Sequence, residues 1–459
     1  MTVNIKMNDK SLNIEDKGTV KKKNPKKKKL IILITILVFV GIALLCGHFL
    51  GEKTGLKLSI TDVFNPIKAN PQLKKDSSGV YTNTLLVGID TRGSNPGLQN
   101  TDSIMLLSYN HEEHNAILIS IPRDFFVEVP EQGRYTKING IYAIGERIEQ
   151  GNGLKLLQTV AEDITNHEIQ YYGMVNLNGF VELIDTLGGV EVDVENAFVD
   201  YQYPLEGAEH RFQTISFDEG LQTMDGQTAL RYVRSRTSIT RNEGSDFARA
   251  RRQQRLIVGL KNTILSSETL LNPKKVFNII SLLEQNLKYS DFSNEEAQAV
   301  VKIFQKDDMK TYSFVLDPSL ANYTLITDKG LTLDAYTIGP RAGLNNYEEI
   351  HEFIEYAYKK PLLYSENPTI YIYDVGIGNT QALEKTKEFQ EELPYINIQY
   401  MGTILSDISG NYLYKTQEEE NDLDDEITEV FSITMTEKPE FVNNNITNGD
   451  YIILLGSND

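Results

Sequence analysis

The sequence predicts an α/β protein with a layered main domain and a smaller domain after it. Apolar runs of strand length, each bounded by turn residues, begin at about residue 81. Between and after these runs lie segments whose apolar residues recur at helical spacing. The same alternation starts again near residue 367. We therefore expect a layered α/β domain over 81–340, a linker over 341–366 and a small α/β domain over 367–459.

One transmembrane helix is expected before these domains. Residues 30–50 are apolar except for Thr35 and His48, and 21 residues at helical rise span the core of a bilayer. The run is too long for the core of a signal peptide, and no small-residue cleavage site follows it. Seven lysines in the nine residues before it indicate a cytoplasmic tail at 1–29, by the positive-inside rule. We expect a single pass through the cell membrane, with a linker at 51–80 and both domains outside.

Charge and cysteine content narrow the possible partners. The formal net charge is −19, and because residues 1–29 carry +7, the rest of the chain carries −26. A surface this acidic argues against nucleic acid as a partner of the outer domains. The lysine-rich run could be a nucleic-acid or nuclear-localisation patch, but beside an apolar span a role in topology and lipid contact is favoured. The only cysteine, Cys46, lies in the span, so the outer domains have no disulfide and no thiol nucleophile.

The main domain is expected to begin with three strands, "NTLLVGID" at 83–90, "SIMLLSYN" at 103–110 and "AILISIP" at 116–122. The sequence "HEEH" between the second and third is expected to be a hairpin loop. His111 and His114 could alternatively bind a metal ion, but no other His or Cys lies nearby in the sequence.

Helices are expected at 151–164 and 176–189, and the second of these stretches ends in a Gly pair. "VEVDVE" then alternates like a strand. Ser293, with Glu296 three residues later, is a capping-box signature for the start of a further helix.

The small domain is expected to contain three strands and a helix. The strands are "PTIYIYDVG", "INIQYMG" and "DYIILLG", and the helix is "TQALEKTKEFQEEL". The acidic stretch 417–429 is expected to be a solvated loop. Ca²⁺ binding is an alternative, but the stretch lacks the Gly that an EF-hand needs at its sixth loop position.

Polar residues mark the ends of the first three strands. Asp90 and Arg92 follow the first strand, Asp102 opens the second, and Arg123 and Asp124 follow the third. If these strands pair antiparallel in order, all three positions lie at one edge of the sheet. Two carboxylates beside two arginines suit a hard divalent cation that bridges to a phosphate. The alternative is a set of turn residues with surface ion pairs.

Residues 231–255 hold eight of the fourteen arginines and no lysine. Arg binds carboxylate or phosphate with a planar fork, whereas Lys is a hydrated point charge. If "RYVRSR" is extended, Arg234 and Arg236 lie on the same side of the chain. From Asp246 onward a helix is expected.

The expected helix from Asp246 has a core face that includes Ile257, Leu260 and Ile264. At 100° per residue, three polar residues fall on the same stripe, namely Gln253, Arg249 and Asp246. Arg251 and Arg255 point to solvent. Inward-facing arginines at a helix N-terminus favour an anion site. The alternative is an internal salt-bridge network, for which the segment offers Glu243 and Asp246.

The motifs "GIDTRG", "TDS", "SIPRD", "KIN", "DGQTALRYVRSR" and "DFARARRQQR" follow one another in this order after a single expected transmembrane span. In this the chain resembles the LytR–CpsA–Psr family over about 81–340, and its tail more weakly resembles a small C-terminal domain of some members. The resemblance implies a three-layer α/β/α sandwich around a mixed central sheet. It also implies a membrane-anchored phosphotransferase that attaches anionic glycopolymers, such as teichoic acid or capsule, from a polyprenyl-pyrophosphate carrier to peptidoglycan, with the lipid in an apolar groove.

The resemblance further implies roles for individual residues. Asp90 and Asp102 would hold Mg²⁺ or Mn²⁺. The pyrophosphate would be bound by Arg92, Arg123, Lys137, Arg234, Arg236, Arg249 and Gln253. Asp246 would act as base, with Arg123 and Arg249 also catalytic, and Asp124 and Asn139 would support the site. Many members carry Arg where this chain has Asn100, so one phosphate contact is expected to be missing or supplied from elsewhere.

Two other functions remain open at the level of sequence. A pyrophosphatase would hydrolyse the lipid carrier without transferring the polymer. A noncatalytic lipid-binding regulator would use the arginines but not Asp246. Serine and zinc hydrolases are disfavoured because the sequence contains neither GxSxG nor HExxH.

Overall fold

The computed structural model describes residues 72–89, 99–205, 211–240, 243–270, 336–405, 409–416, 422–440 and 449–457, together with parts of 272–327 and residue 442. All of them belong to one compact unit. The expected span at 30–50, the basic tail, Asp90 and Arg92 lie outside these residues. Within the described part of the chain, no helix has the length and apolar character needed to cross a membrane.

A six-stranded mixed sheet forms the centre of the main domain. Its order is β11–β6–β1–β2–β3–β12. β1 pairs antiparallel with β2, and β2 with β3, whereas β1–β6 and β3–β12 are parallel pairs. The strands are β1 (Tyr81–Ile89), β2 (Thr101–Asn110), β3 (Ala116–Ser120), β6 (Tyr171–Asn176), β11 (Leu287–Tyr289) and β12 (Thr311–Val315). The antiparallel order expected for the first three strands is confirmed, so the start of β2 and the end of β3 share one edge.

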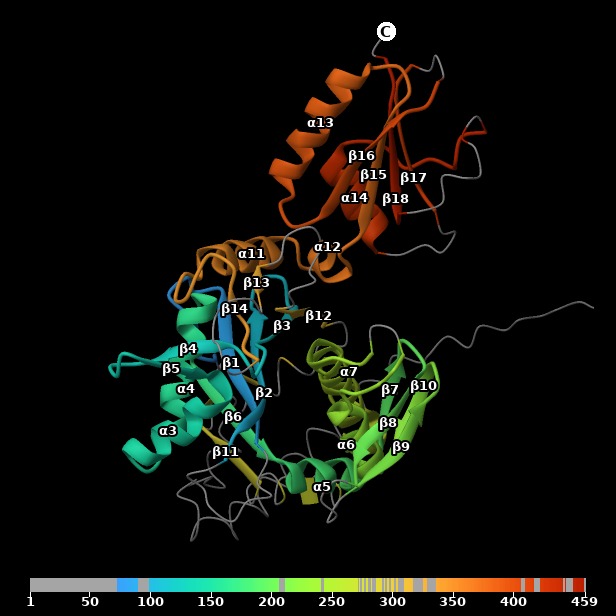
Figure 1. Cartoon of the computed structure of the whole chain (residues 1–459). Helices are drawn as coiled ribbons and strands as arrows, with labels where there is room; N and C mark the ends of the chain where they lie inside the picture. The colour runs from blue at the N-terminus through green and yellow to red at the C-terminus, as the bar shows by residue number, and fades with distance from the viewer. Residues whose placement is uncertain are drawn as a thin grey trace, which may run out of the picture. The chain divides into compact units, whose positions relative to one another are not determined.

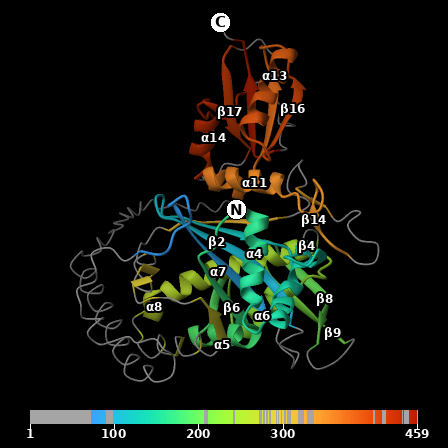
Figure 2. The same ribbon diagram turned by 90° about the vertical axis from the view of Figure 1, so that its left-hand side faces the viewer.

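Helices cover both faces of this sheet (Figure 1). On one face, Leu85, Val87 and Leu106 are buried in the core together with apolar residues of α3 (Ile141–Ile148) and α4 (Gly153–Thr165). Figure 2 looks from the side of α4, which crosses in front of the sheet. The opposite face is packed against α7 (Asp246–Leu265), where Gln254 Nε2 donates to Ser120 Oγ of β3 at 2.8 Å. The main domain is therefore layered α/β/α.

A smaller layer packs on the outer side of α7. It consists of the helices α5 (Leu177–Leu187) and α6 (Gly226–Arg234) and two antiparallel strand pairs. These pairs are β7 (Val190–Val194) with β10 (Gly220–Met224) and β8 (Phe198–Pro204) with β9 (Phe212–Phe217). These elements enclose a second core with Leu256 of α7. A Cβ at Gly259 would lie 2.3 Å from the Glu191 carbonyl oxygen, so α7 and β7 can approach this closely only because Gly occupies the position. α7 is thus buried on two sides.

Short elements connect these layers. They are β4 (Phe126–Val129), β5 (Arg134–Lys137), the 3-10 turn η2 (Ile138–Gly140), α8 (Ser267–Leu270), β13 (Ile326–Thr327) and β14 (Gly339–Pro340). The helix expected at 176–189 ends at Gly188, which has a positive φ of 80° as a C-terminal Gly requires. The capping box is confirmed, since Glu296 N donates to Ser293 Oγ and Ser293 N donates to Glu296 Oε2.

Residues 341–366, which we expected to be a linker, instead form two helices, α11 (Glu348–Lys359) and α12 (Pro361–Glu366). Ile350, Phe353 and Ile354 of α11 are buried. Their i, i+3, i+4 spacing gives α11 an apolar face, and burying that face explains why the stretch folds rather than acting as a spacer.

The C-terminal unit contains a four-stranded sheet in the order β16–β15–β18–β17. Its elements are β15 (Thr369–Asp374), α13 (Asn379–Glu392), β16 (Asn397–Thr403), β17 (Asn411–Lys415), α14 (Leu423–Phe431) and β18 (Tyr451–Leu455). The expected strands and helix are all present. The expected loop at 417–429 is wrong in its second half, because α14 begins there. Leu423, Ile427 and Phe431 form its buried stripe, and acidic residues in its first turn suit the helix dipole.

Candidate functional site

Three segments bring polar side chains together at one edge of the central sheet. The start of β2 supplies Asp102, the turn after β3 supplies Arg123, and the first turns of α7 supply Asp246, Arg249 and Gln253. These residues line one narrow pocket with a volume of about 20 Å³. The convergence of Asp102 and Arg123 follows from the antiparallel pairing of β1, β2 and β3. Ser245 caps the helix that supplies the rest, since its Oγ accepts from Ala248 N at 3.0 Å.

Arg123 is surrounded by carboxylates. Its Nη1 donates to Asp102 Oδ1 at 2.9 Å, and its Nε lies 3.4 Å from Asp124 Oδ2 and 3.8 Å from Asp246 Oδ2. Burial alone would lower the pKa of Arg123, but the charges of Asp246 and Asp102 outweigh it and the pKa is raised. Arg123 therefore joins the three segments as a permanent cation.

Arg249 is a buried cation with spare hydrogen-bonding capacity. The residue is 8% exposed, and its Nη1 lies 3.0 Å from Asp246 Oδ1. Among the described residues its buried Nε has no hydrogen-bond acceptor. Burial lowers the pKa of Arg249, Asp246 opposes this, and the nearby charges of Arg123 and Arg236 add to it. Such an arrangement is costly unless an anion binds there.

The residues expected to support the site do so through Arg123. Lys137 Nζ donates to Asp124 Oδ1 at 2.5 Å, and Asn139 N donates to the Arg123 carbonyl oxygen at 3.2 Å. Burial favours the neutral form of Asp124, but its bond to Lys137 and the charge of Arg123 outweigh burial and hold its pKa below the ordinary value. Lys137 is thus engaged with a carboxylate at the rim of the site.

Gln253 bridges two elements. Its Oε1 accepts from Ser103 Oγ at 2.9 Å, and its Nε2 donates to the Val233 carbonyl oxygen at 3.3 Å. The expected orientation of Gln253 toward the site is confirmed, because it lines the pocket. Its amide nevertheless holds β2 to the end of α6, and direct contact with pyrophosphate stays a prediction.

The two arginines before the loop do not lie on an extended segment. α6 continues through Arg234, and Arg236 follows two residues later. Tyr232 and Val233 pack into the second core, which keeps this stretch helical. Arg236 is exposed yet close enough to lower the pKa of Arg249. Arg234 is half-buried in the last turn of α6.

Arg252 is the residue that the sequence interpretation missed. It is 2% exposed, and its Nη1 donates to Glu243 Oε2 at 2.5 Å. This pair is an internal salt bridge of the kind that the alternative interpretation of the segment predicts. Arg252, Leu256 and Gly259 are spaced by four and three residues, so a second buried stripe was detectable in the sequence. Arg255, expected at the surface, pairs with Glu195 there.

The described residues fit one half of the expected cation site. The Asp102 carboxylate is 32% exposed and faces the pocket, and carboxylate oxygens are the ligands that Mg²⁺ prefers. No cluster of three or more His, Cys, Asp or Glu side chains with metal-binding geometry occurs among the residues that the structure covers. Mg²⁺ needs no such cluster, since it commonly takes one or two carboxylates and completes its shell with water and phosphate.

Comparison with known proteins identifies similar chains. The model of the LytR_cpsA_psr family matches residues 59–332, more than half of the chain. A Bacillus licheniformis protein named polyisoprenyl-teichoic acid–peptidoglycan teichoic acid transferase TagU is 28% identical over 276 residues, which is 58% of this chain and 81% of the relative. The protein of the same name from Bacillus anthracis is 30% identical over 270 residues, 57% of this chain and 79% of its own. The crystal structure of B. subtilis TagV superposes with a TM-score of 0.43 at 25% identity, covering 62% of this chain and 97% of that one.

Proposed function

Because the chain belongs to the LytR_cpsA_psr family, we propose that it is a membrane-anchored, extracytoplasmic phosphotransferase that attaches an anionic glycopolymer from a polyprenyl-pyrophosphate carrier to peptidoglycan. The names of the TagU relatives support both the class of donor and the acceptor. Within the molecule, the observation that carries the proposal is Arg249, a buried cation near Arg123 and Arg236 whose Nε–H has no acceptor among the described residues. A pyrophosphate oxygen would supply the acceptor that this N–H lacks.

The proposed reaction displaces one phosphate from another. An acceptor hydroxyl oxygen attacks the phosphorus atom that carries the polymer, and the bond from this phosphorus to the bridging oxygen breaks. Polyprenyl phosphate leaves with both electrons of that bond, and the polymer becomes joined to the acceptor by a phosphodiester. The hydroxyl proton must leave the attacking oxygen. Such a reaction needs charge neutralisation and a positioned acceptor more than covalent chemistry from the protein.

The residues of the pocket can meet these needs. Arg249 and Arg236 bind the pyrophosphate oxygens, and the N-terminus of α7 adds partial positive charge. Arg123 orients Asp102 and Asp246 while contributing its own charge. Asp246 accepts the hydroxyl proton, because its carboxylate lines the pocket between Arg123 and Arg249. Lys137 and Asp124 hold Arg123 in place.

Asp102 and Asp90 would hold Mg²⁺ or Mn²⁺ in this proposal. When bound, the cation would neutralise charge on the pyrophosphate oxygens. Asp90 follows β1, whose last residue, Ile89, pairs with Thr101 beside Asp102. The position of Asp102, whose partly exposed carboxylate lines the pocket, supports this role.

An apolar surface for the carrier is available on the α7 side of the sheet. Leu86, Leu107 and Val175 are half-buried there. A Cβ built on Gly173, which pairs with Leu86, meets no heavy atom within 4 Å in the described structure. A prenyl chain on this face would place its pyrophosphate toward the end of β1 and the start of β2. The expected membrane span would keep the enzyme beside a lipid-linked substrate that is embedded in the bilayer.

The function can be tested with full-length protein in detergent and a lipid-linked polymer donor. The donor is incubated with and without peptidoglycan, and both polymer-bound peptidoglycan and free polymer are quantified. Transfer should require peptidoglycan, stop on addition of EDTA and resume with Mg²⁺. Asp246→Asn should abolish transfer while leaving the protein folded. The matched control is Arg255→Met, which removes a surface arginine of the same helix and should leave transfer unchanged.

Each outcome separates the candidate functions. Free polymer in the absence and presence of peptidoglycan indicates a pyrophosphatase. No turnover of any donor, with binding retained, indicates a noncatalytic lipid-binding protein. Transfer that survives Asp246→Asn removes Asp246 from its role as base, even where the transferase activity itself is found.

A further inference from the structure

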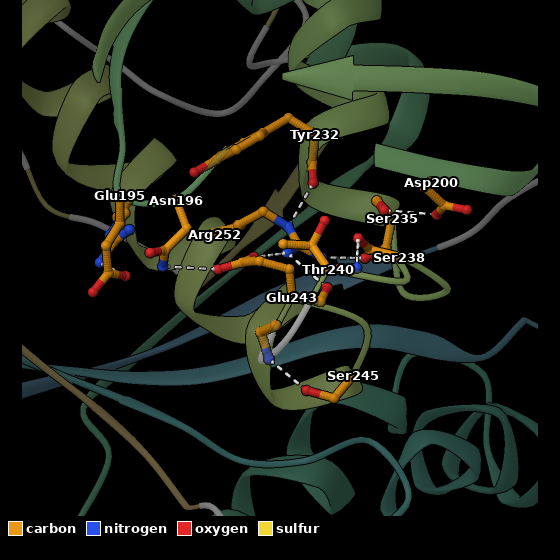
Figure 3. A network of polar contacts seen from close by, with 12 residues as sticks. Glu195, Asn196, Asp200, Tyr232, Ser235, Ser238, Thr240, Glu243, Ser245 and Arg252 are labelled. Atoms are coloured by element: carbon orange, nitrogen blue, oxygen red, sulfur yellow. Dashed lines mark hydrogen bonds and ion pairs between the residues drawn. The ribbon is translucent and has the colours of Figure 1, made fainter. Parts of the chain in front are cut away.

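We propose that Arg252 is a positioning residue for the donor site: with Glu243 it fixes the segment that carries Arg234 and Arg236 against α7. The inference rests on the proposed function, because it concerns the geometry of the pyrophosphate-binding arginines. Figure 3 shows the network around Arg252, in which α7, the end of α6 and the loop before α7 meet.

Arg252 uses four hydrogen bonds to join three segments. Its Nε donates to the Tyr232 carbonyl oxygen at 3.0 Å, and its Nη2 donates to the Ser235 carbonyl oxygen. Its Nη1 donates to both the carbonyl oxygen and the carboxylate of Glu243, at 3.1 and 2.5 Å. A guanidinium has five N–H donors, so four of them are committed within the protein.

Arg252 is therefore not available to the substrate. Its guanidinium lies over the Phe198 ring, 4.6 Å from the centroid, and its charge is neutralised by a carboxylate that is itself buried. Asn196 Nδ2 donates to the other oxygen of that carboxylate, Glu243 Oε1, at 3.2 Å. Arg249, three residues earlier on the same helix, differs because its Nε has no acceptor among the described residues.

The hydrogen bonds of Arg252 hold the C-terminal end of α6. The last carbonyl groups of a helix have no partner within the helix, and here residues of α7 donate to them. Arg252 bonds Tyr232 and Ser235, while Gln253 bonds Val233. Arg234 and Arg236 therefore alternate along the chain with Val233 and Ser235, whose carbonyl oxygens accept hydrogen bonds from α7.

A second anchor holds the same segment from the side of β8. Asp200, which is buried, accepts from Ser235 Oγ at 2.7 Å and from Thr237 Oγ1 at 2.8 Å. Ser238 Oγ donates to the Val199 carbonyl oxygen of β8 at 2.8 Å. Arg236 therefore extends from a backbone that is fixed at both neighbouring residues. An exposed side chain on a fixed backbone is suited to contact a ligand repeatedly in one geometry.

The separation between the cations of the site follows from this network. Arg249 belongs to α7 and Arg236 to the segment after α6, and Arg252 joins the two one helical turn away from Arg249. If this contact is lost, Arg236 can move relative to Arg249, and a pyrophosphate can no longer be bound by both at once. Lys at position 252 keeps the charge but lacks the planar fork needed to bond three segments.

The test compares Arg252→Lys and Glu243→Gln with the control Arg255→Lys in the full chain. Binding of geranylgeranyl pyrophosphate is measured by calorimetry, and KM and kcat for the lipid-linked donor are measured well below the unfolding temperature of each variant. Loss of one charge-assisted contact corresponds to about a tenfold change. We expect affinity to fall and KM to rise by about tenfold in the two variants, with kcat within about twofold. Arg255→Lys should match the wild type.

A purely structural role for Arg252 would lower the unfolding temperature without changing KM in the folded fraction. Wild-type affinity in both folded variants overturns the inference. If either variant does not fold, Asp200→Asn decides, because it loosens the same segment from the other side: a raised KM supports the inference and an unchanged KM overturns it. If the wild-type protein itself neither binds the prenyl pyrophosphate nor transfers polymer, the proposed function fails instead.

Discussion

Arg249→Met should leave the resting protein about as stable as the wild type and disable it as a transferase. Two effects offset each other in the resting fold. Removing a buried N–H that has no acceptor among the described residues relieves about 1–3 kcal/mol, and losing the 3.0 Å pair with Asp246 costs about 1.5–3 kcal/mol. Asp246 keeps Arg123 as a partner and remains partly exposed, so its charge is not stranded. The net change in the free energy of unfolding should be within about 1 kcal/mol.

Arg252→Met provides the contrast, since the two arginines are three residues apart on one helix. Glu243 would be left buried and charged, and carbonyl oxygens of Tyr232 and Ser235 would lose their donor. Breaking a buried pair in this way costs about 3–5 kcal/mol. For a domain of this size about 1 kcal/mol shifts the unfolding temperature by about 2–4 °C. Arg252→Met should therefore unfold at least about 6 °C lower, and Arg249→Met within about 4 °C of the wild type.

The assay is thermal unfolding of the full chain without donor, followed by the transfer rate at a temperature where all variants are folded. Loss of a charge-assisted contact that forms only with the donor should slow transfer by Arg249→Met by about 10- to 200-fold. Destabilisation of Arg249→Met as large as that of Arg252→Met, or polymer transfer by Arg249→Met within about threefold of the wild-type rate, would contradict this role of Arg249.

Two further predictions follow from the described geometry. Gly173→Ile should weaken binding of a long-chain prenyl pyrophosphate but not of inorganic pyrophosphate, because the new side chain would occupy the open face beside Leu86. Equal losses of affinity for both ligands would count against a prenyl chain on this face. Burial lowers the pKa of His167 below its ordinary 6.5, although the bond with the Thr165 carbonyl opposes this. At acidic pH the unfolded chain therefore binds a proton at His167 more readily than the folded chain does. The contribution of His167 to the free energy of unfolding is complete above pH 6.5 and decreases as the pH falls below 6.5. Urea unfolding between pH 7.5 and 5.5 should lose this slope in His167→Asn, and an unchanged slope contradicts the assignment.

The central sheet could be predicted from the sequence because its signals are local. The first strands are continuous apolar runs with turn residues at their ends, and a four-residue link between the second and third requires antiparallel pairing. Once that pairing is assumed, Asp102 and Arg123 must share an edge, and their 2.9 Å bond follows. The helix from Asp246 was equally accessible, since Ser245 supplies its cap and Arg249 and Gln253 fall on one stripe.

The elements that escaped prediction depend on contacts between distant residues or on apolar stripes masked by charge. The strand β7 was expected, but its partner β10 and the pair β8–β9 were not, and β10 lies well beyond β7 in the sequence. α14 was hidden by its acidic first turn, although Leu423, Ile427 and Phe431 recur every four residues. In both cases the burial that stabilises the element comes from partners that a local window does not contain.

The arginine-rich segment shows where projection onto a helix is insufficient. A projection with a single core face separates inward from outward residues, but α7 is buried on two sides, and Arg252 faces the second. Two acids of the segment each take one arginine: Glu243 pairs with Arg252 and Asp246 with Arg249. The two pairs differ in whether the remaining N–H groups of the arginine find acceptors. Arg252 has further acceptors in backbone carbonyl groups, whereas Arg249 has a buried N–H without an acceptor among the described residues and lies near two more cations. A buried donor without an acceptor and two neighbouring cations therefore meet at Arg249, and a pyrophosphate oxygen bound there can accept the hydrogen bond that the described residues do not provide.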